Sequence, residues 1–250
     1  MPAPTCARIL AILSFHKIGA PSDHEWDTWF YIPEKVFIDQ LEWLRKNDWD
    51  VIGIHDFLHG LSDPGSLHER SALLTFDDGY ELIATIALPC LQRFGYPAVV
   101  FVPTDYIGGT NSFDLDNEPV ERICSWDELR RLEAGGVTVQ SHGVTHRTFS
   151  ELSPDDQREE VEHSKSILEQ GLHTTVSTFA FPFGDGGASE TVTPMVAKAG
   201  YRAAFLYGAN SVYLPEHLPV GDAYRLDRVA VGPDTDFGGI LGQAVVRSTS

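Results

Sequence analysis

The chain has 250 residues, of which 42% are hydrophobic and 22% are charged, and these values are typical of a folded globular protein. Its formal net charge of −18 argues against nucleic acid and anionic membrane surfaces as partners, because both would repel it. The three cysteines are scattered and form no CxxC pair, which excludes a disulfide framework and a thiolate metal site. The length suits one large domain, and we expect a single domain over residues 1–250.

The apolar stretch near the N-terminus is short, comprising residues 9–13 and Phe15. It is too short for the core of a signal peptide and far too short to span a bilayer, so it predicts a first β-strand and no membrane insertion. We therefore expect a cytoplasmic protein, although a secreted protein trimmed of its leader would begin in the same way.

Strand and helix patterns then alternate along the chain. Short apolar or β-branched runs predict strands at residues 51–54, 72–76, 98–102, 137–140, 177–181, 203–206 and 228–231. Helical spacing and capping signals predict helices at residues 33–46, 81–94, 125–134, 154–170 and 193–199. About seven alternations, with no repeat and no linker, predict an α/β fold and favour a parallel barrel over an open sheet.

Polar residues follow several of these predicted strands. Asp77 and Asp78 follow residues 72–76, His142 and His146 follow residues 137–140, and His16 follows the first strand. In a parallel barrel the chemistry collects at the C-terminal ends of the strands, so we expect these side chains to converge. The polar segment of residues 105–124 leaves the same rim and is a candidate substrate loop.

Two imidazoles and one carboxylate make a facial metal site, and the second carboxylate is then free for proton transfer. These two imidazoles and two carboxylates are the minimum set of groups that a metal-assisted hydrolase requires. Each motif alone is weak, because Asp-Asp-Gly is a common turn and a histidine pair is often structural. The same ligand set also suits Fe(II), but the alternating α/β pattern fits poorly with an iron oxygenase.

The motifs TFDDGY, SHGVTH and the PFG of FAFPFG resemble those of the polysaccharide deacetylases, the NodB-homology domains of carbohydrate esterase family four. The resemblance covers about residues 8–231 and is closest to the exopolysaccharide deacetylase branch. It implies a distorted (β/α) barrel of about seven parallel strands and hydrolysis of N-acetyl groups on amino sugars. It also implies one divalent metal ion, usually Zn²⁺, with Co²⁺, Ni²⁺ or Mn²⁺ as alternatives.

Carried over residue by residue, the resemblance makes Asp77 the general base and Asp78, His142 and His146 the metal ligands. The backbone N–H of Phe183, after the motif proline Pro182, would bind the oxyanion.

Two departures from the family pattern concern other catalytic groups. Ala180 stands where many members have an arginine that pairs with the catalytic aspartate, and Arg228 is the nearest replacement. The usual C-terminal Leu-x-His segment, which supplies the general acid, is absent. His16 is our candidate for that acid, in preference to His217.

Aromatic residues gather in the segment HEWDTWFY, soon after His16. Buried packing is the simplest interpretation, but sugar rings stack on exposed aromatics, so Trp29 and Tyr31 are candidates for substrate binding together with Pro182. The resulting hypothesis is a metal-dependent deacetylase acting on an N-acetylated glycan. Two alternatives remain open: an O-acetyl esterase or other amidase, and a catalytically weakened carbohydrate-binding barrel.

Overall fold

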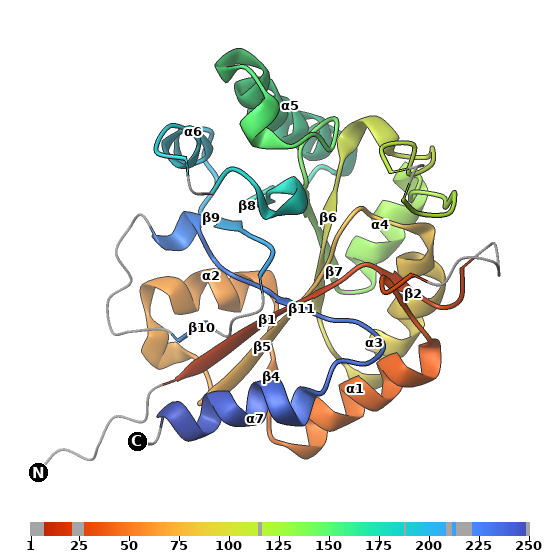
Figure 1. The fold of residues 1–250 in the computed structure, drawn as a ribbon, viewed down its shortest axis with the longest axis vertical. Coiled ribbons are helices and arrows are strands. Elements are labelled where there is room, and N and C mark those ends of the chain that lie inside the picture. The colour runs from red at the N-terminus through yellow and green to blue at the C-terminus, as the bar shows by residue number, and fades with distance from the viewer. Residues whose placement is uncertain are drawn as a thin grey trace, which may run out of the picture.

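A parallel sheet curled into a distorted barrel forms the centre of the molecule (Figure 1). The computed structural model describes residues 8–21, 28–114, 117–187, 189–208, 212–213 and 222–248. Its main sheet contains β1 (Ile9–Phe15), β4 (Asp50–Val51), β5 (Arg70–Phe76), β6 (Ala98–Val102), β7 (Val137–Ser141), β8 (Thr178–Ala180), β9 (Ala203–Phe205), β10 (Val212–Tyr213) and β11 (Val229–Ala230). A second sheet pairs β2 (Lys17–Ile18) with β3 (Tyr31–Ile32).

The barrel is a ring of seven parallel strands. Strands β1, β5, β6, β7, β8 and β9 pair in this order, and β11 lies on the other side of β1. Two isolated parallel bridges, Phe205 to Leu226 and Gly208 to Val229, connect β9 to the segment of β11 and close the ring. The short β4 extends the edge of β5, and β10 runs antiparallel to β1. The predicted distorted barrel of about seven parallel strands is therefore confirmed.

Helices surround the ring on its outer face and at its N-terminal end (Figure 1). They are α1 (Glu34–Lys46), α2 (Ile54–Ser62), α3 (Leu88–Phe94), α4 (Trp126–Ala134), α5 (Pro154–Leu172), α6 (Val192–Lys198) and α7 (Phe237–Ser248). The predicted capping box of α4 is present, since Ser125 and Glu128 bond reciprocally. Within the described residues, no helix is both long and apolar enough to cross a bilayer.

Successive side chains of each strand point to opposite faces of the sheet, and the two faces belong to different apolar clusters. Residues such as Leu74 and Val100 belong to the larger cluster, which also contains the buried faces of α1 and α4. Alternate residues such as Leu73 and Phe101 belong to a smaller cluster with α2. Phe57 of α2 contacts Phe205 of β9, their ring centroids being 5.4 Å apart. Arg202, directly before β9, donates to the carbonyl of Leu58 across 3.3 Å, so this helix lies at the N-terminal end of the barrel.

Several features differ from the predicted elements, and helix α2 is not among those predicted. Residues 51–54 are not one strand, because β4 ends at Val51 and Ile54 already begins α2. The predicted helix of residues 81–94 contains a π-helical turn at Ile83–Ala87, just before Pro89, which has no N–H to continue regular helical bonding.

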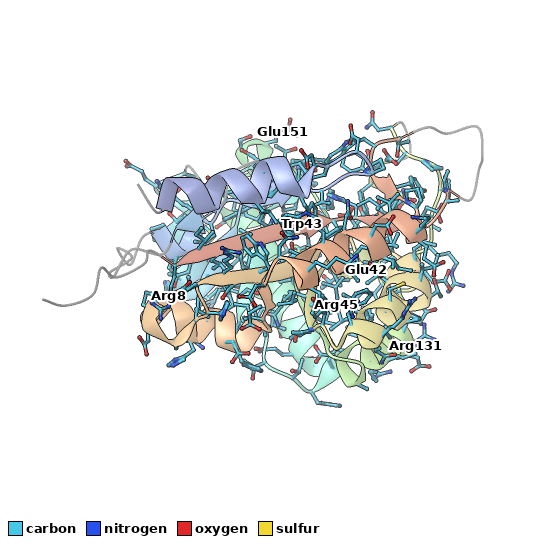
Figure 2. All side chains as sticks on the ribbon, turned by 90° about the horizontal axis from the view of Figure 1, so that it is seen from below. Arg8, Glu42, Trp43, Arg45, Arg131 and Glu151 are labelled. Carbon is cyan, nitrogen blue, oxygen red and sulfur yellow. The ribbon has the colours of Figure 1, made fainter. Side chains whose placement is uncertain are left out.

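The glycine-rich helix α7 was not predicted at all. Phe237 of α7 packs edge to face on Trp43 of α1. Figure 2 labels Trp43, which lies beside α7. Leu241 is buried in the larger cluster, so tertiary packing outweighs the weak helix propensity of glycine.

Candidate active site

The two aspartates leave β5 in a tight left-handed turn. The backbone N–H of Asp77 donates to Phe15 of β1 across 2.9 Å, which continues the parallel ladder. Asp78 then has a φ of 67° and Gly79 a φ of 70°, conformations that aspartate tolerates and glycine favours. A side chain on Gly79 would also press on Val102, only 3.0 Å away. The turn separates the two adjacent carboxylates and gives each a different set of neighbours.

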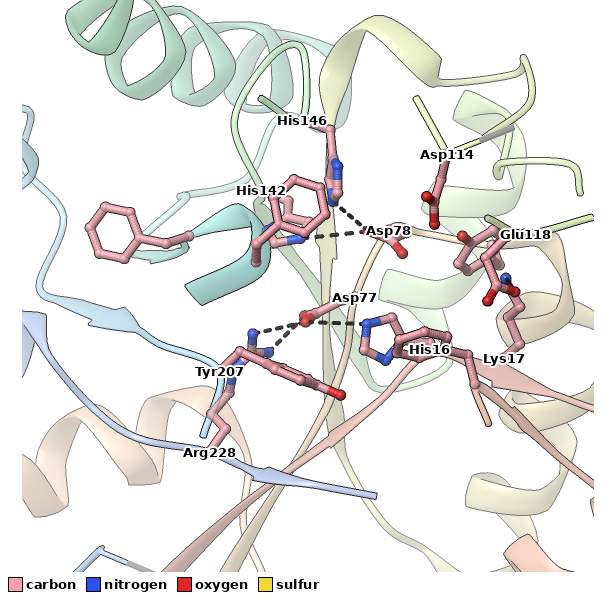
Figure 3. A pocket seen from close by; sticks show the side chains of 14 residues that line it. His16, Lys17, Asp77, Asp78, Asp114, Glu118, His142, His146, Tyr207 and Arg228 are labelled. Carbon is pink, nitrogen blue, oxygen red and sulfur yellow. Dashed lines mark hydrogen bonds and ion pairs between the residues drawn. The ribbon is translucent and has the colours of Figure 1, made fainter. Parts of the chain in front are cut away.

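Asp78 converges with the two predicted histidines. Its Oδ1 atom lies 3.1 Å from Nε2 of His146 and 3.5 Å from Nε2 of His142 (Figure 3). One ligand atom from each residue lies within 4.8 Å of the others, and all three side chains are buried. Two imidazole nitrogens and one carboxylate oxygen, with room for water or substrate, form the donor set of catalytic zinc sites.

The protonation of these groups fits a metal ion. Burial lowers the pKa of His142 to about 4, so its imidazole is neutral near neutral pH. The Nδ1 atom of His142 lies 2.8 Å from the carbonyl of Ala180, and donation there leaves the Nε2 lone pair facing Asp78. Burial raises the pKa of Asp78, but the combined effects of His146, His16 and His142 outweigh it and hold that pKa below its ordinary value. Oδ1 of Asp78 is buried without a hydrogen-bond partner, as expected of an atom that binds a cation.

Asp77 has a different partner, the fully buried Arg228. The guanidinium of Arg228 donates to both carboxylate oxygens of Asp77, at 2.7 and 2.8 Å. Burial raises the pKa of Asp77, but the charge and hydrogen bonds of Arg228, together with His142 and His16, outweigh it and hold that pKa below its ordinary value. Arg228 thus pairs with Asp77, and Ala180 is fully buried.

His16 lies on the opposite side of Asp77 from Arg228 (Figure 3). Its Nε2 is 4.0 Å from Oδ2 of Asp77, and its Nδ1 is buried without a hydrogen-bond partner. Burial lowers the pKa of His16 despite the neighbouring carboxylates. The resting imidazole is therefore neutral, and it must gain a proton before it can act as an acid.

A pocket surrounds these groups and includes residues that the sequence analysis did not single out. Tyr207, Lys17, Glu118 and Asp114 line it together with the aspartates and histidines (Figure 3). Tyr207 lies two residues past β9, so the strand-end rule that selected Asp77 also applied to it. Burial raises the pKa of Tyr207 to about 12, which keeps the phenol protonated.

The predicted substrate loop contributes to the pocket through Asp114 and Glu118. Glu118 accepts a bond of 2.8 Å from Lys17, and both side chains are buried. The Lys17 ammonium also lies over the rings of Tyr31 and Tyr80, 4.7 and 4.6 Å from their centroids. These contacts connect the loop to the segment that follows His16.

Three predicted substrate-binding residues do not line the pocket. Trp29 lies outside it and donates to Asp234 across 2.8 Å. Tyr31 is buried, and its hydroxyl donates to Glu121 across 2.8 Å. Pro182 is also buried, whereas Phe30, which lies between the two aromatic candidates, does face the pocket.

Substrate contact by Trp29, Tyr31 and Pro182 therefore stays a prediction. Tyr31 and Pro182 are buried, whereas Trp29 is 39% exposed.

Phe183 does line the pocket, and it is the most exposed of the large apolar residues there. Its φ of 58° is left-handed, and its ring packs edge to face on His146 at 4.9 Å. The other candidate acid, His217, lies outside the described residues.

Comparisons with known proteins agree with this geometry. The family model for polysaccharide deacetylase matches residues 65–204. The poly-beta-1,6-N-acetyl-D-glucosamine N-deacetylase of Staphylococcus aureus (strain MRSA252) is 24% identical over 212 residues, covering 78% of this chain and 70% of the relative.

Solved structures share the fold at low identity. The Streptococcus pyogenes deacetylase PplD, in complex with acetate, has a TM-score of 0.79 and 19% identity, and the match covers 94% of this chain and 98% of that one. IcaB from Ammonifex degensii has a TM-score of 0.76 and 22% identity, with coverage of 97% and 98%. The matched motifs, the barrel and the buried Asp-His-His cluster lead to one conclusion: the chain belongs to the polysaccharide deacetylase family.

Proposed function

We propose that this protein is a metal-dependent hydrolase that removes N-acetyl groups from the amino sugars of a glycan. One observation carries the proposal: two adjacent carboxylates have different partners. Asp78 faces two imidazoles, whereas Asp77 is held by Arg228 and stays outside that ligand set. A pure carbohydrate-binding barrel has no need of a second, separately held carboxylate. We take Asp78, His142 and His146 as the ligands and Zn²⁺ as the ion, with Co²⁺, Ni²⁺ and Mn²⁺ as alternatives.

A divalent ion at this site supplies two things, a lowered pKa for a bound water and polarisation of the acetyl carbonyl. Asp77 then accepts the proton of the attacking water. Its ion pair with Arg228 keeps it deprotonated and fixes both of its oxygens. The backbone N–H of Phe183 is our candidate donor to the oxyanion.

The departing nitrogen needs a proton, and His16 is our candidate for the group that delivers it. Because its resting imidazole is neutral, the proton must come from the reaction itself. We infer that one water relays the proton taken by Asp77 to His16, whose Nε2 lies 4.0 Å from Oδ2 of Asp77, and that His16 then passes it to the leaving amine. This route returns both residues to their starting states without an external acid.

The test is an assay for released acetate. The metal-stripped protein and the zinc-reloaded protein are each given oligomers of β-1,6-linked N-acetylglucosamine, chosen because the Staphylococcus aureus relative is named for that polymer. Oligomers of β-1,4-linked N-acetylglucosamine and an O-acetylated sugar serve as comparisons. We expect metal-dependent release of acetate with a free amine as the second product. Release from the O-acetylated sugar alone would establish the esterase alternative, and no release from any substrate would favour a binding protein.

A further inference from the structure

Both predicted histidine ligands lie on one short loop after β7, and a single carboxylate from α5 holds that loop. Glu160 is 4% exposed. Its Oε2 atom accepts from the backbone N–H of Val144 across 2.6 Å and from that of Thr145 across 3.0 Å. Its Oε1 atom accepts from the Thr145 hydroxyl. All these contacts fall between His142 and His146, so the carboxylate sits at the centre of the loop.

The loop conformation depends on such a partner. Gly143 has a φ of 83°, and His146 has a left-handed φ of 56°, which is uncommon for a residue other than glycine. The backbone N–H groups of Val144 and Thr145 point to the same side and would be costly to leave unpaired. Glu160 satisfies both, and a side chain on Gly143 would meet its Oε2 at 2.7 Å.

The opposite side of the loop is fixed by the turn after β6. The carbonyls of Gly143 and Val144 accept from Thr104 and Asp105 at 3.1 and 3.0 Å. The Thr145 carbonyl accepts from the hydroxyl of Tyr106 at 3.2 Å. The loop is therefore held between the turn after β6 and helix α5. Glu160 is the ionisable residue of α5 that makes these contacts.

We propose that Glu160 is a positioning residue that sets metal affinity, because it fixes the loop that carries His142 and His146. The inference rests on the proposed metal site. Glu160 does not touch the two imidazoles in the structure; it acts through the backbone between them. Outer groups that orient metal ligands typically contribute about 10- to 100-fold in affinity. We expect Glu160→Gln to weaken Zn²⁺ binding by a factor in that range.

The experiment measures the dissociation constant of Zn²⁺ by competition with a chromophoric chelator, for the intact chain and two variants. Glutamine keeps the shape of Glu160 but replaces one acceptor oxygen with an NH₂ group that faces backbone donors. The matched control is Glu169→Gln, since Glu169 lies on the same helix and also accepts from a backbone N–H, that of Val176 at 3.1 Å. We expect Glu169→Gln to bind Zn²⁺ as the unaltered protein does. The absorption spectrum of bound Co²⁺ should change in Glu160→Gln alone, because it reports ligand geometry.

A second variant covers the case in which Glu160→Gln fails to fold. Thr145→Val keeps the side-chain shape and removes one contact to Glu160, so we expect a smaller, several-fold loss of affinity. Wild-type affinity in whichever of these variants folds, with an unchanged Co²⁺ spectrum, would overturn the inference. Failure of the unaltered protein to bind Zn²⁺ would instead contradict the proposed metal site, so the two failures are distinguishable.

Discussion

Inward-facing positions of the same strands carry opposite chemistry at the two ends of the barrel. Toward the N-terminal end, Leu10, Leu73 and Ala203 belong to one apolar cluster with α2. Four to six residues further along the chain, the corresponding positions are His16, Asp77 and Tyr207, which line the pocket together with Arg228. The apolar end contributes folding free energy through burial. The polar end has a high desolvation cost, which is offset only by specific pairs such as Arg228 with Asp77.

Stability and chemistry are therefore separable along the barrel axis. Substitutions in the apolar cluster with α2 should alter the unfolding free energy and leave the metal-ligand atoms in place. Changes at the rim should alter proton transfer or metal binding while the fold persists.

Among changes at the polar end, His16→Ala should have a large effect on the rate. General acid catalysis is typically worth about 10²- to 10⁴-fold, so the rate on an N-acetyl amide should fall by about that factor. An activated ester such as nitrophenyl acetate needs no proton on its leaving group, and its rate should fall much less. Steady-state kinetics on both substrates measure the difference. Equal losses on the two would assign His16 to positioning or folding instead.

In the apolar cluster with α2, Phe57→Ala should lower the unfolding free energy by about 3–5 kcal/mol, because it leaves a cavity against Phe205. Denaturant titration measures this loss. Metal stoichiometry and the rate per folded molecule should stay unchanged. If Zn²⁺ binding weakened in the folded variant, the two ends of the barrel would not be independent.

The smallest effect is a pH dependence of the metal-free protein. Burial lowers the pKa of His142 from 6.5 to about 4, and it also lowers that of His16. The unfolded chain therefore binds these protons at higher pH than the folded one. Stability from these groups is complete above pH 6.5 and declines as the pH falls toward 4.

Chemical denaturation at about pH 7 and at about pH 4.5 checks this direction. An unfolding free energy that did not decrease at the lower pH would contradict it.

Much of the rim could be predicted because parallel strands end at one edge. Asp77, Asp78, His142 and His146 each follow a strand that the hydrophobic pattern identifies, and the barrel brings those ends together. Arg228 was found from the absence of an arginine at Ala180, although only the structure shows that its guanidinium reaches Asp77.

Other features depend on tertiary contacts that a local pattern does not contain. The role of Glu160 requires knowing that α5 packs beside the loop after β7. Helix α7 has three glycines and forms because it covers the core. Helix α2 is a different case, since Ile54, Phe57 and Leu58 have helical spacing, but the β-branched residues before them favoured a strand.

The proposed mechanism gives the two neighbouring aspartates different roles, with Asp77 as the base and Asp78 as a metal ligand. Its most direct test is to measure bound Zn²⁺ and acetate release for Asp77→Asn and Asp78→Asn side by side. We expect Asp77→Asn to keep one metal ion while its rate falls by about 10²- to 10⁴-fold, because asparagine preserves shape but cannot accept the proton. We expect Asp78→Asn to lose stoichiometric metal. Loss of metal in Asp77→Asn, or full metal and full activity in Asp78→Asn, would contradict the account.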